Sequence, residues 1–255
     1  MSVQKIVGLA VAVAVTMTAC GAGNADGPSG ATDEEQAEVI EWEDAQVFIE
    51  HNGEDGDYGF HAEFGGDPWS TASILAPDGT VIFTASTGGV LDEHGMSGIT
   101  FESAEFPPGE VDRQEFLERF AEGDYSFTGE TLEGERLEGT WTFTHLVPDP
   151  PTIVSPLRAA ELDPSSVTVA WEPVTNPAGV DIEVYVLQLF PVDPPEGQDP
   201  IALNIDYTFE VPAEITAIRL LPELFAAGES YEFELMAVDA AGNQAFALGE
   251  FSISP

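Results

Sequence analysis

Four side chains with metal-binding chemistry stand close together near the start of the chain. They are His51, Asp55, Asp57 and His61, in and around the turn-rich segment GEDGDYG. Imidazole nitrogens and carboxylate oxygens both coordinate cations, so this acidic turn is a candidate cation or small-ligand site. The segment lacks the spacing of a calcium-binding loop and the HExxH pairing of zinc enzymes. A solvated turn without a ligand is the alternative interpretation, because Asp and Gly are ordinary turn residues.

No catalytic motif stands out in the sequence. The 47 acidic residues form so many carboxylate pairs that none is distinguished as a glycosidase pair. There is no GxSxG motif, and the GMSG segment at residues 95–98 lacks the strand-to-helix context of a serine nucleophile. His94 is interpreted as a loop residue, since no partner that would make it a catalytic base is identifiable. We therefore expect a non-catalytic protein that uses no cofactor.

The charge balance excludes one class of partner. The chain has 47 Asp and Glu residues against six Lys and Arg residues, a formal net charge of −41. Nucleic-acid binding depends on neutralising phosphates with basic side chains, so no nucleic-acid partner is expected. A saline habitat would explain the acidity, because salt screens self-repulsion. The alternatives are that the acidic groups bind cations or repel anionic neighbours.

Residues 1–19 have the pattern of an export signal. Lys5 gives a basic start, residues 6–15 are apolar, and small residues precede Cys20. The apolar run is shorter than the roughly 20 residues that cross a bilayer, so a transmembrane anchor is disfavoured. The mature chain would have no lysine, and its 47 acidic residues against five arginines give a formal net charge of −42.

The tetrapeptide Met17-Thr18-Ala19-Cys20 resembles the bacterial lipobox. The resemblance implies that Cys20, the chain's only cysteine, becomes the lipidated first residue of a membrane-anchored lipoprotein. Gly21 is not the aspartate associated with inner-membrane retention, so the resemblance implies an outer-membrane or cell-surface location in the bacterial envelope. An ordinary signal peptide and free secretion are the alternative. Residues 20–37, rich in Gly, Ala, Asp and Glu, are predicted to be a flexible tether.

Residues 38–148 are predicted to form a β-rich domain with one short helix. The helix is expected in VDRQEFLERF, with Phe116, Leu117 and Phe120 on one face, Asp112 as its cap and Gly123 as its stop. A hairpin follows, with a turn near EGER and with Trp141 and Phe143 predicted to face the core. Earlier strands are expected at 45–50, 58–64, 70–75 and 81–84, separated by turns at Asn52-Gly53, Gly65-Gly66 and Pro77-Asp78-Gly79.

Residues 149–255 are predicted to form an all-β domain after the proline-rich linker PDPP. SVTVAW places Val167, Val169 and Trp171 on one face, and SYEFELMAV does the same for alternate residues from Tyr231. About seven short strands without a cysteine pair indicate a β-sandwich. With its proline-rich entry, Trp171 and the corner ending at Tyr231, this segment resembles a fibronectin type III domain, an immunoglobulin-like sandwich. In that family the tyrosine hydroxyl bonds back to the upstream backbone, and the domains are spacers and binding surfaces.

The chain from residue 37 onward also resembles a group of secreted bacterial proteins in which segments like NGEDGDYGFHAEFGGDPW precede such a domain. This resemblance supports the two-domain layout and implies no activity. Two functions therefore remain open. One is a lipid-anchored, surface-exposed protein with an interaction or structural role, whose partners are the membrane, through the lipid on Cys20, and another protein. The other is an accessory protein that binds a cation or small ligand at the acidic turn. The sequence leaves the oligomeric state open.

Overall fold

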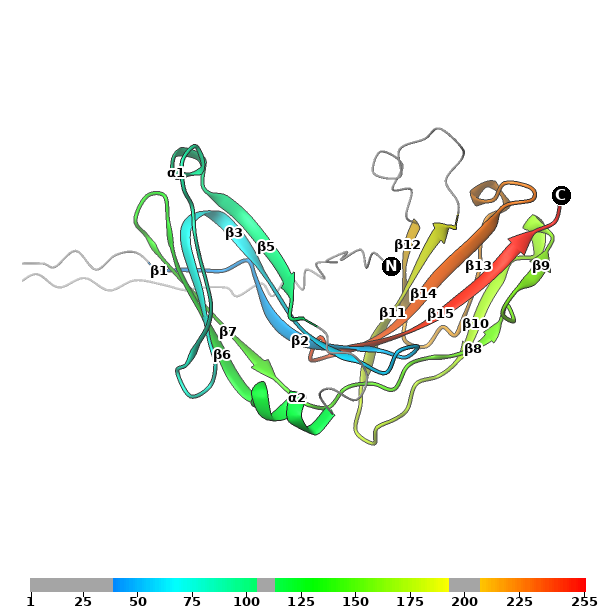
Figure 1. Ribbon diagram of the computed structural model, residues 1–255, viewed down its shortest axis with the longest axis horizontal. Helices are drawn as coiled ribbons and strands as arrows, with labels where there is room; N and C mark the ends of the chain where they lie inside the picture. Colours follow the sequence, from blue (N-terminus) through cyan, green and yellow to red (C-terminus); the bar gives the residue numbers. More distant parts are fainter. Residues whose placement is uncertain (1–38, 105–112, 193–206) are drawn as a thin grey trace, which may run out of the picture. The chain divides into compact units, whose positions relative to one another are not determined.

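The computed structural model describes residues 39–104, 113–192 and 207–255 (Figure 1). The predicted signal peptide, the tether with Cys20, and the predicted helix cap Asp112 lie outside these ranges. The described chain divides into two compact units. The first contains residues 39–46, 62–101 and 124–141, and the second contains residues 47–61, 102–104, 113–123, 142–192 and 207–255.

The first unit is built from strands that pack an aromatic core. Their order is β1 (Val39–Glu41), β7 (Arg136–Phe143), β6 (Gly123–Thr131) and β3 (Tyr58–Leu75), and both β4 (Val81–Ser86) and β5 (Met96–Glu102) pair with β3. The ring of Trp42 lies edge-on to Phe64 at 5.3 Å and to Trp69 at 6.1 Å between centroids. Burying such large rings supplies most of the hydrophobic stabilisation that a small β domain has.

The predicted Pro77-Asp78-Gly79 turn is confirmed. It joins β3 to β4, the backbone N–H of Thr80 donates to Asp78 Oδ1 at 2.8 Å, and Gly79 has a φ of 83°. Glycine adopts this left-handed conformation without a steric cost, whereas a residue with a Cβ would be strained there. The hydrogen bonds hold the pKa of Asp78 below its usual value.

The predicted turn at Gly65-Gly66 is wrong, because one continuous strand, β3, runs through both glycines. Gly65 instead lets another strand approach closely, whereas a Cβ on Gly66 would lie 3.2 Å from the backbone nitrogen of Glu43. A Cβ on Gly65 would lie 2.8 Å from the carbonyl oxygen of Ser97 on β5. Glycine inside a strand commonly marks such a close approach of a second backbone, and sequence periodicity does not distinguish this role from a turn.

The predicted hairpin and helix are both present. Phe116 is buried on α2 (Arg113–Arg119), and Phe143 is buried on β7, whereas Trp141 is only half-buried. A four-residue helix, α1 (Leu91–His94), was not predicted, and it places His94 on a helix instead of in a loop. The GMSG segment leads into strand β5, so it has no strand-to-helix turn of the kind that exposes a serine nucleophile. Within the described ranges, no helix is long and apolar enough to cross a membrane.

The second unit contains the predicted sandwich. One sheet has the order β2 (Asp44–Asn52), β15 (Gln244–Ile253), β14 (Ser230–Asp239), β11 (Ile182–Pro191) and β12 (Tyr207–Pro212), with β9 (Ala160–Leu162) also paired to β15. The other has the order β13 (Ala217–Arg219), β10 (Thr168–Glu172) and β8 (Thr152–Ser155). Short 3-10 turns occur at Pro164–Ser166 and Pro222–Leu224.

The residues predicted to face the sandwich core do so. Val167, Val169 and Trp171 on one sheet pack in one cluster with alternate residues of β14 on the other sheet, from Tyr231 to Ala237. The Tyr231 hydroxyl accepts a hydrogen bond of 2.8 Å from the backbone N–H of Ala226, as the predicted tyrosine corner requires. The mainly β fold class is therefore confirmed, and the second unit contains the predicted two-sheet β-sandwich with its tyrosine corner.

Strand β2 adds to the edge of this sandwich. Its last three residues pair in parallel with the start of β15, Glu50 opposite Gln244 and Asn52 opposite Phe246. The adjacent Asn243, which is 1% exposed, accepts a hydrogen bond from the Ile49 N–H at 2.8 Å and donates to the Thr144 carbonyl at 3.1 Å. The second unit thus includes parts of the segment predicted as the N-terminal domain. The boundary between the two compact units does not fall at residue 148.

Candidate metal centre

Two of the four predicted metal ligands have neighbours that explain their positions without a metal. The His51 ring stacks on Tyr58 with 4.3 Å between centroids and 7° between planes. Burial lowers the pKa of His51, although the carboxylate of Asp149 opposes this effect. Asp55 belongs to the turn after β2, where Asn52 Oδ1 accepts from the Glu54 N–H at 2.9 Å and Asn52 Nδ2 donates to Asp55 Oδ2 at 3.4 Å.

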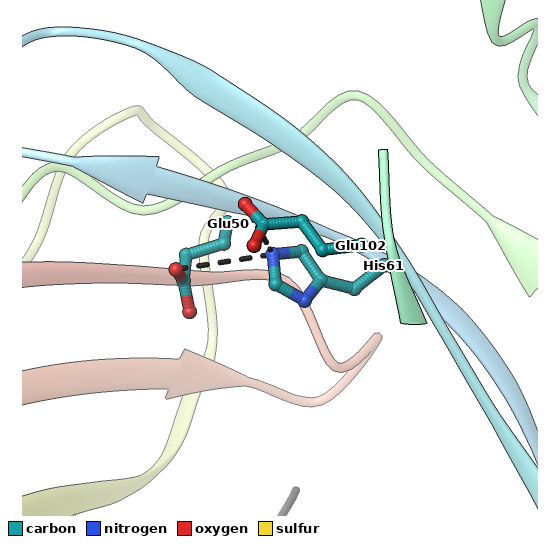
Figure 2. A group of neighbouring side chains, drawn as sticks. All are labelled: Glu50, His61 and Glu102. Carbon is teal, nitrogen blue, oxygen red and sulfur yellow. Dashed lines mark ion pairs between the residues drawn. The ribbon is translucent and has the colours of Figure 1, made fainter. Parts of the chain in front are cut away.

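His61 lies between two carboxylates that the sequence did not single out. Its Nε2 atom is 3.4 Å from Glu102 Oε1 and 3.8 Å from Glu50 Oε1. Figure 2 shows the imidazole edge directed toward both carboxyl groups. Glu50 comes from β2, His61 from β3 and Glu102 from the last position of β5. Each offers a ligand atom, and these atoms all lie within 4.8 Å of one another. We call these three residues the Glu50–His61–Glu102 cluster.

His61 is buried, and the two glutamates of the cluster are partly buried. The side chains of His61, Glu102 and Glu50 expose only 6%, 12% and 17% of their surface. Burial raises the pKa of Glu50 most strongly, His61 opposes this shift, and the like charge of Glu102 adds to it. Asp57, the third predicted ligand, is close enough for its carboxylate to raise the pKa of Glu50 further. Burial, and then the charge of Asp55, raises the pKa of Asp57 itself. Anionic oxygens are therefore concentrated where solvent screens them poorly.

The Nε2 atom of His61 is in an unusual position. It is buried, and within the described residues it has no hydrogen-bond partner. Both carboxylate oxygens lie farther from Nε2 than the usual length of an N–H···O hydrogen bond, about 2.7–3.2 Å. A buried polar atom without a partner costs about 1–3 kcal/mol, and native structures contain few of them. Asp57 Oδ1 is a second buried atom without a partner in the described chain.

The surroundings fix the cluster in place. The His61 ring stacks on Phe48 with 5.0 Å between centroids and 15° between planes. Gln244 Nε2 donates a hydrogen bond to Glu50 Oε2, which links the cluster to β15. A Cβ on Gly59 would lie 2.6 Å from Glu102 Oε1 and 3.0 Å from His61 Nε2. Glycine is therefore the residue that lets these two groups approach the backbone of β3 so closely.

Of the four predicted ligands, the structure brings only His61 into this cluster, with Asp57 nearby. Sequence reasoning missed Glu50 and Glu102 because they are 52 residues apart and meet only through the packing of three strands. One local signal was present for Glu50. It follows three buried residues, Val47, Phe48 and Ile49, where an acidic side chain is unexpected.

Comparisons with known proteins do not assign this chain to a family. No protein-family model matches the chain, and no curated protein matches it. A segment of two fibronectin type III domains from chicken tenascin is 12% identical, with 82% of this chain and 97% of that one covered, at a TM-score of 0.29. The fn3 domain of the human collagen alpha-1(XX) chain is 24% identical, with coverage of 42% and 85%, at a TM-score of 0.27. The fold assignment therefore depends on this chain's own strand order and tyrosine corner.

Proposed function

We propose that this chain is an exported, lipid-anchored protein of the bacterial envelope with an interaction or structural role and no catalytic activity. The observation that carries the proposal is the order of its parts. A predicted export signal with a cysteine at the lipobox position precedes a segment predicted to be a flexible tether, and the first described strand, β1, begins at Val39. A tether of about 17 residues reaches roughly 23 Å, enough to hold a folded domain clear of a bilayer.

Several buried polar groups of the folded part stabilise turns and strand junctions, which is consistent with a non-catalytic role. Asp239 Oδ1 accepts hydrogen bonds from the backbone N–H groups of Ala241 and Asn243, both at 2.9 Å. Asn243 joins the end of β2 to the segment at Thr144. Tyr185 and Tyr231 hydroxyls accept from backbone N–H groups of neighbouring loops. Such bonds make a rigid β scaffold, which is what a spacer or a binding surface needs.

The charge of the mature chain indicates the chemistry of a protein partner. At a formal net charge of −42, contact with another acidic surface would be repulsive. A partner with exposed arginine and lysine side chains has the complementary potential and would associate fastest at low salt. The proposal therefore includes a basic protein partner at the cell surface.

The proposal can be tested by crosslinking in native cells followed by separation of membrane and soluble fractions. Amine-reactive reagents are unsuitable for this chain, because Lys5 is its only lysine and lies in the predicted signal. Crosslinkers that couple carboxylates, or carboxylates to a partner's amines, suit its 47 acidic residues. Wild type is compared with Cys20→Ala and with Met17→Leu, a change in the same motif that introduces the usual lipobox residue.

We expect wild type and Met17→Leu to be in the membrane fraction and to crosslink to one dominant partner. Cys20→Ala should leave that fraction and lose the crosslink. If Cys20→Ala partitions like wild type and no partner is captured in any sample, both the anchoring and the interaction proposals are wrong. A freely secreted protein would then be the better description.

A further inference from the structure

Two ligand-to-ligand distances in the Glu50–His61–Glu102 cluster match those of a metal-ion site. Ligands about 2.0–2.2 Å from a tetrahedral zinc ion lie about 3.3–3.6 Å from one another. The distances from His61 Nε2 to Glu102 Oε1 and Glu50 Oε1 are 3.4 Å and 3.8 Å. These values exceed the usual hydrogen-bond length and agree within a few tenths of an ångström with the edge of such a tetrahedron.

The groups of the cluster are also ones that a bound cation would satisfy. His61 is 5% exposed, and its Nε2 atom points between the two carboxylates without a hydrogen-bond partner in the described chain (Figure 2). Glu50 and Glu102 add two carboxyl groups in the same poorly solvated place. A divalent cation would give Nε2 a partner and would neutralise both carboxylates at once. Buried charges in proteins are normally paired or bound to metals.

The residues around the cluster resemble those that support metal ligands in other proteins. Metal-binding residues are typically held by an outer set of hydrogen bonds and packing contacts. Here Gln244 donates to Glu50, and Phe48 stacks on His61. Gly59 leaves the space into which Glu102 and His61 extend, since a Cβ there would lie 2.6 Å from Glu102 Oε1.

The geometry points to a site in which Glu50, His61 and Glu102 bind one divalent first-row transition cation of the zinc class. One imidazole and two carboxylates suit zinc and its neighbours, whereas calcium and magnesium prefer oxygen ligands alone. Three protein ligands leave a fourth position for water or for a further carboxylate, and Asp57 is the adjacent acidic residue. The site is independent of the proposed anchoring role, because its ligands all belong to the folded second unit.

The test uses zinc as the probe and the chain carrying Cys20→Ala, since an unmodified thiol would itself bind zinc. The protein is stripped with a chelator and titrated with zinc in molar sodium chloride and excess magnesium, which occupy the acidic surface. We expect one zinc per chain, and at 100 times the dissociation constant a rise in Tm of about 5–10 °C. Cobalt substitution should give the visible absorption of a tetrahedral site, and zinc should shift the NMR signals of one histidine ring.

Matched variants locate the site. Glu50→Gln and Glu102→Gln each remove one ligand charge and should weaken zinc binding at least 10-fold, and His61→Ala should abolish the cobalt spectrum. Glu223→Gln removes the same charge from an exposed position and should bind like the parent chain. Gly59→Ala keeps all three ligands, but its added Cβ would displace the side chains of Glu102 and His61. This variant therefore tests the site even if a variant that lacks a ligand does not fold.

The inference is overturned if zinc binds the parent chain and the folded ligand variants with equal affinity. It is also overturned if Gly59→Ala folds and binds zinc unchanged, or if zinc produces no Tm rise above the value in excess magnesium alone. A shift at His51, His94 or His145 in place of His61 would contradict the ligand assignment.

Discussion

Asp239 is buried at the end of β14, where a negative charge is costly. Removing that charge should stabilise the protein at neutral pH. The residue is 4% exposed, and burial raises its pKa from 3.8 to about 6. The backbone N–H groups of Ala241 and Asn243 oppose this shift, whereas the charges of Asp181 and Glu183 add to it. Each pKa unit corresponds to about 1.36 kcal/mol, so the ionised form costs the fold about 3 kcal/mol.

The sign of the pH dependence follows from the raised pKa. The folded state binds the proton more tightly than the unfolded state, so the contribution of Asp239 to stability is fully present below about pH 4. It is lost as the pH rises through about 6. The Asp239→Asn variant keeps an oxygen that can accept the bonds from Ala241 and Asn243 but carries no charge. We expect the variant to exceed wild type in unfolding free energy by about 1–3 kcal/mol at pH 7.5, and this difference to shrink toward zero at pH 4.

Urea denaturation followed by tryptophan fluorescence, repeated from pH 4 to pH 8, measures this difference. The many other carboxylates titrate in both proteins and cancel in the comparison. Asp163 provides a control of opposite sign, because Ser165 hydrogen bonds lower its pKa at an exposed turn. Asp163→Asn should therefore lose stability at neutral pH. If Asp239→Asn is no more stable than wild type at pH 7.5, or its advantage does not change with pH, the reasoning about its burial is wrong.

Four further predictions concern the packing and charge of the folded part. Asn243→Ala leaves buried backbone groups of the β2 junction without partners, so urea denaturation should show a loss of about 2–4 kcal/mol, and a loss below 0.5 kcal/mol would contradict this role. Tyr231→Phe removes the corner hydrogen bond and should cost about 1–2 kcal/mol in the same assay, with unchanged circular dichroism. Gly249→Ala places a Cβ 2.2 Å from the Phe233 ring and should lower Tm, whereas Gly88→Ala, with nothing within 4 Å, should not. Sodium and potassium chloride should raise Tm equally if screening of the acidic chain is the cause, and a response to one cation alone would indicate specific binding.

Most of the sandwich could be predicted because its signals are local. The alternation that buries Val167, Val169 and Trp171 follows from the two-residue period of a strand. The tyrosine corner at Tyr231 depends on a short stretch of chain. The errors have a shared cause. The glycines at 65–66 look like a turn in sequence, yet Gly65 lets β5 approach β3 and Gly66 lies against Glu43, which only the tertiary structure reveals.

The candidate site was predicted only in part for the same reason. His61 was found because histidine is rare in this chain, and an imidazole near aspartates is conspicuous. Glu50 and Glu102 were lost among 47 acidic residues, since nothing in composition tells a buried glutamate from an exposed one. Three strands bring them to His61, and long-range pairing of this kind leaves little trace in a single sequence.

The central claim, that the folded part is held at a membrane through Cys20, is tested most directly by the mass of the mature N-terminus from native cells. Trypsin is unsuitable because the first arginine is Arg113, so cleavage after glutamate should be used to release residues 20–34. We predict a peptide that begins at Cys20 and carries a diacylglyceryl thioether. A peptide that begins elsewhere, or one in which the Cys20 thiol is unmodified, would contradict the claim.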